Sequence, residues 1–398
     1  MSTRYYSSVF RARATARQGN HELLQERTMS LPLDGIRIIS MAEQYPGPFA
    51  TLLMADLGAD VIMVERASGG DPSRQFPGFH ASLNRNKRSI TLDLKSDHGR
   101  EALRRLIKDA DVLMEGFRPG TMARLGFDYA AVAALNPRVV YMSISGFGQT
   151  GPYRDRPAHD LSYQAITGLL FRQAATGQPE LRPDLAIGDL SSAMFAVVGT
   201  LSALLDRARS GRGKYVDVSM TDCLVSWMTT FLGPVMNGGA CVSIEAEPAY
   251  GIFKCADGKL LTLSIAHEDW FWESFCTLLG MTDVARLQRP ERLAQEPELR
   301  DRISTHLLAK PRSNWGELFD KARIPWGPVN SIEEVGADPH FRERGLFHRI
   351  PERDGTQAWY VAQPLVFDAS RPGPARGVPA LGADTAEVLE SIGLSPEK

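Results

Sequence analysis

The sequence is poor in cysteine. Its 398 residues contain four cysteines, Cys223, Cys241, Cys255 and Cys276. They form no C-x-x-C pair, and no histidine lies beside them to complete a zinc site. We therefore expect free thiols in a reducing compartment, no metal site and no tightly bound cofactor.

Long apolar runs and strong net charge are also missing. No apolar run approaches the roughly 20 residues that span a bilayer, so no membrane partner is expected. The formal net charge is −2 and no polybasic cluster occurs, which argues against nucleic acid as a partner. With 43% hydrophobic and 23% charged residues, the composition is that of a globular protein long enough for two domains.

The N-terminal segment differs from the rest of the chain. Residues 1–17 contain four arginines and several serines but no acidic residue, a composition that resembles an organellar presequence. Met29, however, stands just before the first expected strand and is a natural start. We predict that residues 1–30 are a disordered extension and that the protein is cytoplasmic, with mitochondrial import as the alternative.

Apolar β-rich runs alternate with helical patterns after residue 31, which predicts an α/β fold with a parallel sheet. The expected strands are 36–40, 61–64, 89–94, 111–115 and 139–145, and the expected helices are 49–57 and 98–109. Residues 41–47, between the first strand and its helix, lack the G-x-G-x-x-G fingerprint of dinucleotide-binding folds. An NAD-dependent oxidoreductase is therefore disfavoured.

A second domain is expected where this alternation ends. Residues 249–265 predict a hairpin that turns at Asp257-Gly258, and a helix follows at 268–279. We predict a large Rossmann-like domain from residues 31–224, a small α+β domain from 225–325, and a return segment, 326–398, that completes the large domain.

Asp189 is the strongest candidate for a catalytic residue. It ends the apolar, strand-like run from Leu185, and the small and apolar residues after it predict a helix. The free amides and the dipole at a helix start favour an anion there, so Asp189 is suited to be a nucleophile and the amides beyond it to hold an oxyanion. The alternative is that Asp189 only caps the helix.

His159 and Asp160 form a second candidate pair, after the loop 146–152. If His159 faces Asp189 across a pocket, the two groups could move a proton on opposite faces of a carbon, as a racemase requires. Asp189 alone would support acyl transfer through an anhydride. The structural alternatives are a helix cap for Asp160 and a surface histidine for His159.

Basic residues recur near the expected strand ends. Individually each is typical of a solvated surface charge, but together they could bind a phosphate-rich ligand. They are Arg66, Lys87, Arg88, Lys95, Arg118 and Arg124.

Several ordered motifs make the sequence resemble the class III (CaiB/BaiF type) CoA-transferase family over essentially all of residues 31–398. The motifs are residues 33–38 with Pro46-Gly-Pro48, 56–62 with Glu65-Arg66, 84–95, Phe117-Arg-Pro-Gly120 with 124–127, 145–152, Gly188-Asp189, 211–217 and 324–330.

The resemblance implies a large Rossmann-like domain built from both chain ends, a small domain between them, and an interlocked homodimer. It also implies coenzyme A as the acyl carrier, with its nucleotide held by Tyr45, Arg66, Leu92, Lys95, Phe117 and Arg124. In such transferases the aspartate that matches Asp189 forms an anhydride and then an aspartyl-CoA thioester, so that CoA passes between carboxylic acids.

A sister branch, the α-methylacyl-CoA racemases, has a histidine and an aspartate that match His159 and Asp189. The residues after Asp189, Leu190-Ser-Ser-Ala-Met194, are closer to the transferase pattern. We therefore predict a CoA-transferase, with a racemase as the alternative and a non-catalytic CoA-binding module as a third possibility. The acyl pocket is expected at residues 236–239 with Glu245 and Glu247, and the acids transferred stay open.

Overall fold

The computed structural model describes residues 31–174, 184–241 and 247–395, so the predicted extension 1–30 lies outside the described residues. The chain divides into two compact units. Unit 1 runs to Met228 and resumes at Gly345, and unit 2 is Thr229–Arg344.

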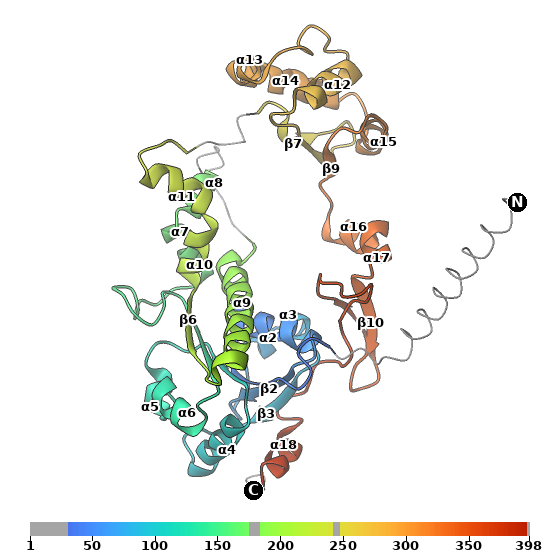
Figure 1. Cartoon of the computed structure of the whole chain (residues 1–398). Coiled ribbons are helices and arrows are strands. Elements are labelled where there is room, and N and C mark those ends of the chain that lie inside the picture. The colour runs from blue at the N-terminus through green and yellow to red at the C-terminus, as the bar shows by residue number, and fades with distance from the viewer. Residues whose placement is uncertain (1–30, 175–183, 242–246, 396–398) are drawn as a thin grey trace, which may run out of the picture. The chain divides into compact units, whose positions relative to one another are not determined.

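Unit 1 is built on a parallel sheet of six strands in the order β3-β2-β1-β4-β5-β6 (Figure 1). The order reverses between β1 and β4, and in open α/β sheets ligands bind at the carboxyl ends of the strands beside such a reversal. The strands are β1 (Arg37–Met41), β2 (Asp60–Glu65), β3 (Arg88–Thr91), β4 (Val112–Glu115), β5 (Val140–Ser145) and β6 (Tyr215–Ser219).

Both faces of the sheet are covered, because successive side chains of a strand point to opposite faces. Ile38 and Val61 pack in one apolar core with α2 (Pro46–Asp56) and α9 (Ile187–Ser210). The next residue of each strand, Ile39 and Ile62, packs in a second core with α4 (Asp97–Lys108), α6 (Tyr129–Leu135) and α18 (Thr385–Ser391). The predicted α/β architecture is confirmed, and the predicted strands are found within a few residues.

The other helical segments of unit 1 are short. They are η1 (Pro72–Gln75), α3 (Pro77–Asn84), α5 (Thr121–Leu125), α7 (Asp160–Ile166), α8 (Leu169–Ala174) and α10 (Met220–Trp227).

Within the described part of the chain, α9 is the one helix long and apolar enough to cross a membrane by length and composition. The sequence analysis predicted a helix after Asp189 but not an apolar segment of this length, because glycine, serine and threonine interrupt the apolar residues without adding charge. Ala193, Ala196 and Val197 of α9 are buried in the core of unit 1. A core helix passes the same test, and packing in the core explains the apolar residues on the buried side of α9.

The C-terminal segment returns to unit 1. The Asn86 side-chain oxygen accepts hydrogen bonds from the backbone amides of Ala375 and Arg376, at 2.9 and 2.8 Å. The Asp384 carboxylate accepts the Ser89 amide of β3 at 2.8 Å. A hairpin of β10 (Phe347–Pro351) and β11 (Gln357–Val361) precedes these C-terminal residues in the chain.

Unit 2 holds an antiparallel sheet of β7 (Tyr250–Lys254), β8 (Leu260–Ser264) and β9 (Trp326–Pro328). The predicted hairpin is confirmed, since β7 pairs with β8. The predicted domain end at residue 325 is too early, because β9 pairs with β8. The helices are α11 (Thr229–Met236), α12 (Asp269–Leu279), α13 (Arg289–Ala294), α14 (Glu296–Leu307), α15 (Arg312–Ala322), α16 (Ile332–Ala337) and α17 (Pro339–Glu343).

The core of unit 2 is aromatic, with Trp272, Phe275 and Phe319 fully buried.

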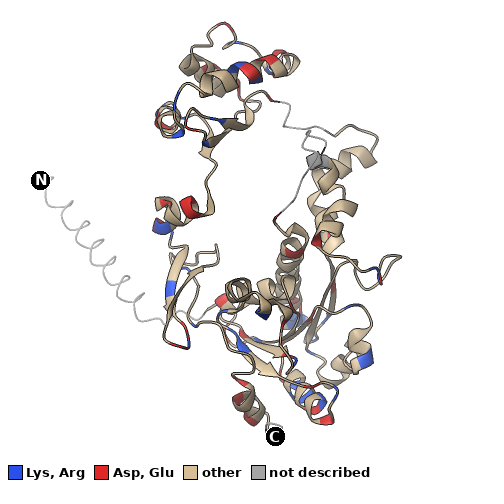
Figure 2. Ribbon diagram, turned by 180° about the vertical axis from the view of Figure 1, so that it is seen from behind, with Lys and Arg blue, Asp and Glu red and all other residues tan. Residues whose placement is uncertain are grey.

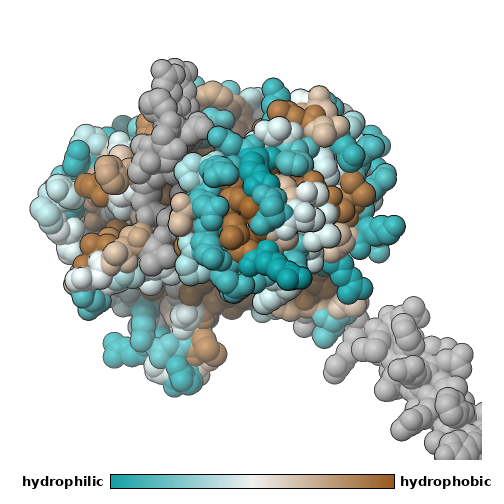
Figure 3. Space-filling view, turned by 90° about the horizontal axis from the view of Figure 1, so that it is seen from above, coloured by the Kyte–Doolittle hydropathy of each residue, from teal (hydrophilic) through white to brown (hydrophobic). Residues whose placement is uncertain are grey.

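On the face seen from above, apolar residues lie in patches that hydrophilic residues border (Figure 3). All four cysteines are free of disulfides, as predicted.

Candidate functional site

The residues expected to hold CoA lie at the carboxyl ends of four neighbouring strands. Tyr45 lies between β1 and α2, Arg66 directly follows β2, and Leu92 and Lys95 follow β3. Phe117 follows β4, and Arg124 is in α5. Parallel strands bring these loops to one edge of the sheet, beside the reversal in strand order.

The loops after β1 and β4 touch at this reversal. A Cβ atom on Gly116 would lie 3.3 Å from the Cβ of Ala42, so the two backbones approach closely there. The Phe117 amide donates to Glu115 at 2.9 Å, and the Tyr45 ring meets Phe79 edge-on with centroids 5.0 Å apart. These contacts fix both aromatic residues at the edge.

The basic side chains of this edge keep their charge available. Arg66 donates to the Gly70 carbonyl at 2.8 Å and Arg124 to the Thr121 hydroxyl at 2.9 Å, both neutral partners. Arg66, Lys95 and Arg124 are exposed. Within the described residues none of the three forms an ion pair, so they are suited to bind phosphate groups.

Arg154, which the sequence analysis missed, joins this basic edge. A Cβ atom on Gly120 would lie 3.5 Å from a terminal nitrogen of both Arg124 and Arg154. The two guanidinium groups therefore lie around the turn that ends at Gly120. The signal in the sequence was an arginine-rich stretch, 154–156, directly after the glycine-rich loop.

Lys87 and Arg88 do not line a ligand site, contrary to the prediction. Lys87 is 1% exposed and donates to the Pro48 carbonyl and the Asn84 side-chain oxygen, both at 2.8 Å. Burial holds the pKa of Lys87 well below its usual value. Arg88 pairs with Asp60 at 2.5 Å. Both residues lie at the start of β3 rather than after it, so they stabilise the fold.

Asp189 lies in the first turn of α9, which begins two residues earlier, at Ile187. The N-cap is Ala186, so the alternative of Asp189 as a cap is wrong. The Asp160 carboxylate of α7 accepts the amides of Gly188 and Asp189 at 2.7 and 3.1 Å. The next amide, of Leu190, bonds the Ala186 carbonyl at 3.0 Å. These helix-start amides are therefore occupied, which differs from the prediction that they hold an oxyanion.

The environment of Asp189 favours its neutral form. Burial, and secondly the charge of Asp160, raises the pKa of Asp189 from 3.8 to about 7. Burial and then the charge of Asp189 raise the pKa of both Tyr45 and Tyr163, so the two phenols lie within reach of its field. Tyr45 therefore links the expected CoA-binding edge to the candidate nucleophile.

His159 is exposed and forms the N-cap position of α7, without a capping bond from its side chain. Its carbonyl accepts the Ser162 amide at 2.8 Å. Asp160, the next residue, binds the Asp189 backbone, so His159 and Asp189 lie at the same end of the sheet. Between their side chains, both of which the structure describes, there is no hydrogen bond.

The region expected to line an acyl pocket is only partly described. Residues 236–239 are exposed at the end of α11, and Glu245 lies outside the described residues. Glu247 is 1% exposed and pairs with Arg289 at 2.5 Å, so it supports unit 2 rather than lining a pocket.

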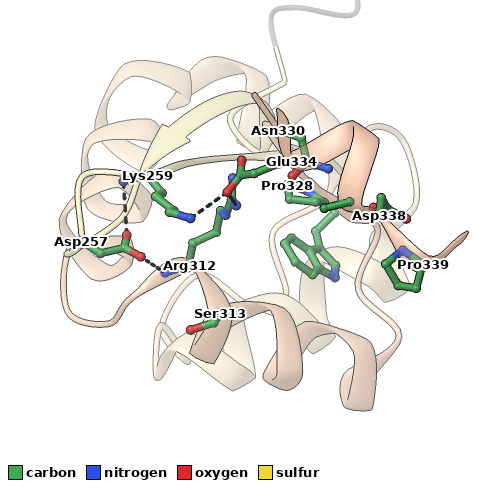
Figure 4. Close-up of a pocket in the computed structure, with 11 residues that line it drawn as sticks. Asp257, Lys259, Arg312, Ser313, Pro328, Asn330, Glu334, Asp338 and Pro339 are labelled. Carbon is green, nitrogen blue, oxygen red and sulfur yellow. Dashed lines mark hydrogen bonds and ion pairs between the residues drawn. The ribbon is translucent and has the colours of Figure 1, made fainter. Parts of the chain in front are cut away.

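Unit 2 contains a pocket of about 450 Å³ between the β7–β8 turn, α15 and α16 (Figure 4). Lys259 and Arg312 both reach Glu334, at 2.7 and 2.8 Å, and the Asp257 carboxylate accepts the Arg312 amide at 3.2 Å. Its cations are therefore neutralised within the pocket, unlike Arg66, Lys95 and Arg124 of unit 1. Among the described residues, no group of His, Cys, Asp and Glu side chains could hold a metal ion.

Comparison with known sequences decides the family. The sequence model of CoA-transferase family III matches residues 33–385. The chain belongs to CoA-transferase family III. The acyl-CoA transferase of Fusarium pseudograminearum is 35% identical, with 95% of this chain and 89% of the relative covered. The succinate–glutarate CoA-transferase of Agrobacterium fabrum is 33% identical, with 91% and 96% covered.

A racemase is also among the relatives of this family III chain. Human α-methylacyl-CoA racemase is 30% identical, with 92% of this chain and 95% of the relative covered. Among solved structures, a CaiB/BaiF family protein from Brucella suis has a TM-score of 0.80 at 29% identity, covering 92% of this chain and all of that chain. The predicted family is confirmed.

Proposed function

We propose that this protein is an acyl-CoA:carboxylate CoA-transferase in which Asp189 is the nucleophile. The observation that carries the proposal is a partly buried carboxylate in the first turn of α9, at the same sheet edge as a row of uncompensated basic residues. Arg66, Lys95 and Arg124 would bind the phosphates of CoA, and Tyr45 lies between them and Asp189.

The chemistry needs no energy source besides the thioester. An Asp189 oxygen attacks the acyl carbonyl, the C–S bond breaks, and CoA leaves as a thiolate. The thiolate then attacks the Asp189 carbonyl of the anhydride, which releases the first acid as a carboxylate and leaves an aspartyl-CoA thioester. The acceptor acid takes the CoA by the same steps in reverse.

A racemase is the second candidate, because His159 directly precedes the residue that binds the Asp189 backbone. In that function His159 and Asp189 would remove and return the proton on the α-carbon, and no acyl group would reach Asp189. The two candidates therefore differ in a covalent product.

The test is mass spectrometry of the protein after incubation with acetyl-, succinyl- and glutaryl-CoA and trapping with hydroxylamine. A hydroxamate at Asp189 is expected, and Asp189→Asn should form none. Asp206→Asn, on the last turn of the same helix, should be trapped like the wild type. Unmodified Asp189, together with deuterium entering a 2-methylacyl-CoA in heavy water, would establish the racemase instead.

The homodimer implied by the family resemblance is part of the proposal. Met194, Val198 and Leu205 of α9 are 44%, 54% and 67% exposed and lie along one side of the helix. The middle of α9 carries no charged side chain (Figure 2). Val225 and Trp227 of α10, which packs against α9, are also exposed. An apolar surface of this kind supports a partner, and a second copy of the chain is the one proposed.

A further inference from the structure

We propose that Asp160 is a positioning residue, whose carboxylate holds the backbone of the nucleophile by accepting the amides of Gly188 and Asp189. The inference rests on the proposed role of Asp189 and extends it. One oxygen of Asp160 takes both amides, at 2.7 and 3.1 Å. The first turn of α9 is thus fixed to the first residue of α7.

The contact is supported from both sides. The Gln164 side-chain amide donates to the second oxygen of Asp160 and also to the Leu185 carbonyl at 3.1 Å, so α7 holds the segment that leads into α9. Gln164 is fully buried. A Cβ atom on Gly188 would lie 2.7 Å from the Asp160 oxygen, so glycine at position 188 permits the approach.

We call the hydrogen bonds from the Gly188 and Asp189 amides to Asp160 the clamp. The clamp places a second negative charge, that of Asp160, beside the nucleophile Asp189. The other ionisable groups in this field are the phenols of Tyr45 and Tyr163, with Arg118 beyond Tyr163. Among the acids on the other elements packed against α9, Asp56 of α2 pairs with Arg85 and Asp217 of β6 accepts the Gln149 amide. The charge of Asp222 of α10 acts on Cys223 and Asp217. Asp160 is therefore the acid that acts on Asp189, and after burial it is the second cause that raises the pH at which Asp189 becomes ionised.

The clamp also restricts the mechanism. Because Asp160 occupies the Gly188 and Asp189 amides, these cannot stabilise the oxyanion formed on the substrate carbonyl unless Asp160 moves. In the arrangement described, Asp160 contributes by aiming the Asp189 carboxylate.

The test is the pH dependence of acyl-enzyme formation in single turnovers, read by acid quench and intact mass. Asp160→Asn keeps the size and an acceptor oxygen but removes the charge. Gln164 can present its unpartnered Oε1 to the new amide by inverting, with loss of its hydrogen bond to the Leu185 carbonyl. Without the repulsion, the midpoint should move to lower pH by about one unit. A midpoint equal to that of the wild type would overturn the electrostatic part of the inference, the action of the Asp160 charge on Asp189.

Asp160→Ala and Gly188→Ala test the geometric role. Each should slow acyl transfer roughly 10- to 100-fold at the pH optimum, because the nucleophile is misaligned, while CoA binding is retained. Unchanged rates in both variants would overturn the clamp. Asp128→Asn is the matched control, because Asp128 accepts the Ala131 amide at the start of α6, and its midpoint should be that of the wild type.

The wild-type protein separates the two hypotheses. If neither an acyl group nor CoA becomes attached to Asp189 in the wild type, the proposed nucleophile is wrong and the positioning role falls with it. If the acyl group forms and the Asp160 variants behave like the wild type in rate and midpoint, only the positioning role is wrong.

Discussion

Asp189 must be ionised to attack a thioester, yet its surroundings favour the protonated form. Burial and the neighbouring Asp160 raise its pKa to about 7. At neutral pH about half of the molecules would then carry the nucleophilic carboxylate. The same desolvation makes the carboxylate more reactive once it is formed, since fewer waters stabilise it.

The rate of acyl-enzyme formation in the wild type should therefore depend on pH. Below pH about 7 the rate should rise about tenfold per pH unit, and above that value it should level off, because ionised Asp189 is the reacting species. Single-turnover rates between pH 5 and 9 at saturating acyl-CoA measure this. A rate already constant from pH 5 would show that Asp189 ionises at its ordinary pKa or is not the nucleophile.

The raised pKa of Asp189 also predicts how the free energy of unfolding depends on pH. Between pH 4 and 7 the folded protein keeps the Asp189 proton that the unfolded chain releases, so raising the pH destabilises the fold. Asp189→Asn removes this dependence, and its advantage over the wild type in urea denaturation should grow from pH 4 to pH 7 and then stay constant. An advantage that shrinks over this range would contradict the raised pKa.

At the residue scale, local pattern predicted the chemistry but not the burial. Asp189 and Arg66 follow apolar segments, and that order is visible in the sequence. Lys87 was read as a surface charge or as part of a phosphate site, and Glu247 as part of an acyl pocket, yet both are buried against partners from other elements. Those partners are distant in sequence, so a local pattern does not contain them.

At the element scale, the turn from β1 into α2 brings Tyr45 to the site. Gly47 occupies the second position of α2, after Pro46, and a Cβ atom there would overlap the Cβ of Ala42. The close return of the chain therefore depends on the missing side chain of Gly47.

Gly47→Ala should destabilise unit 1 by about 1–3 kcal/mol through this overlap and should weaken CoA binding by displacing Tyr45. Gly78→Ala is a matched control, because Gly78 also follows a proline at the start of a helix, α3, and has open space at its Cβ position. It should be neutral or stabilising by about 0.4–1 kcal/mol. The readouts are urea unfolding and CoA titration, and equal behaviour of the two variants would contradict the role of Gly47.

The presence of helices and strands was predicted better than the residues at which they begin and end. The strands β1 to β5 were found because buried parallel strands are short apolar runs. The start of α9 was placed three residues late, because Ile187 and Gly188 extend an apolar run that does not distinguish strand from helix. Because of this error, the amides of Gly188 and Asp189 were not recognised as belonging to the helix start. Both bind Asp160, a partner that no local pattern reveals.

At the scale of the whole molecule, the family resemblance contributed what periodicity did not. It implied that residues after 326 return to the first domain. The C-terminal segment does return: Arg376 hydrogen-bonds to Asn86, and residues from Gly345 onward belong to unit 1. The boundary itself was misplaced, because β9 is three residues long and its pairing with β8 is not visible in the sequence. Long-range pairing, rather than composition, determines where unit 2 ends.

The proposed homodimer is tested on the apolar side of α9. Val198 and Leu205 are exposed and belong to no charged cluster, so Val198→Glu together with Leu205→Glu places two charges on that side. If a second copy covers it, burying unpaired charges costs several kcal/mol, about what is needed to dissociate a micromolar dimer. Sedimentation should then show monomers at concentrations where the wild type is dimeric. Ala130→Glu, an exposed position on α6, adds a charge to the same unit away from α9 and should leave the dimer intact. A double variant that still sediments as a dimer would place the interface elsewhere, and the exposed side of α9 would then need another explanation.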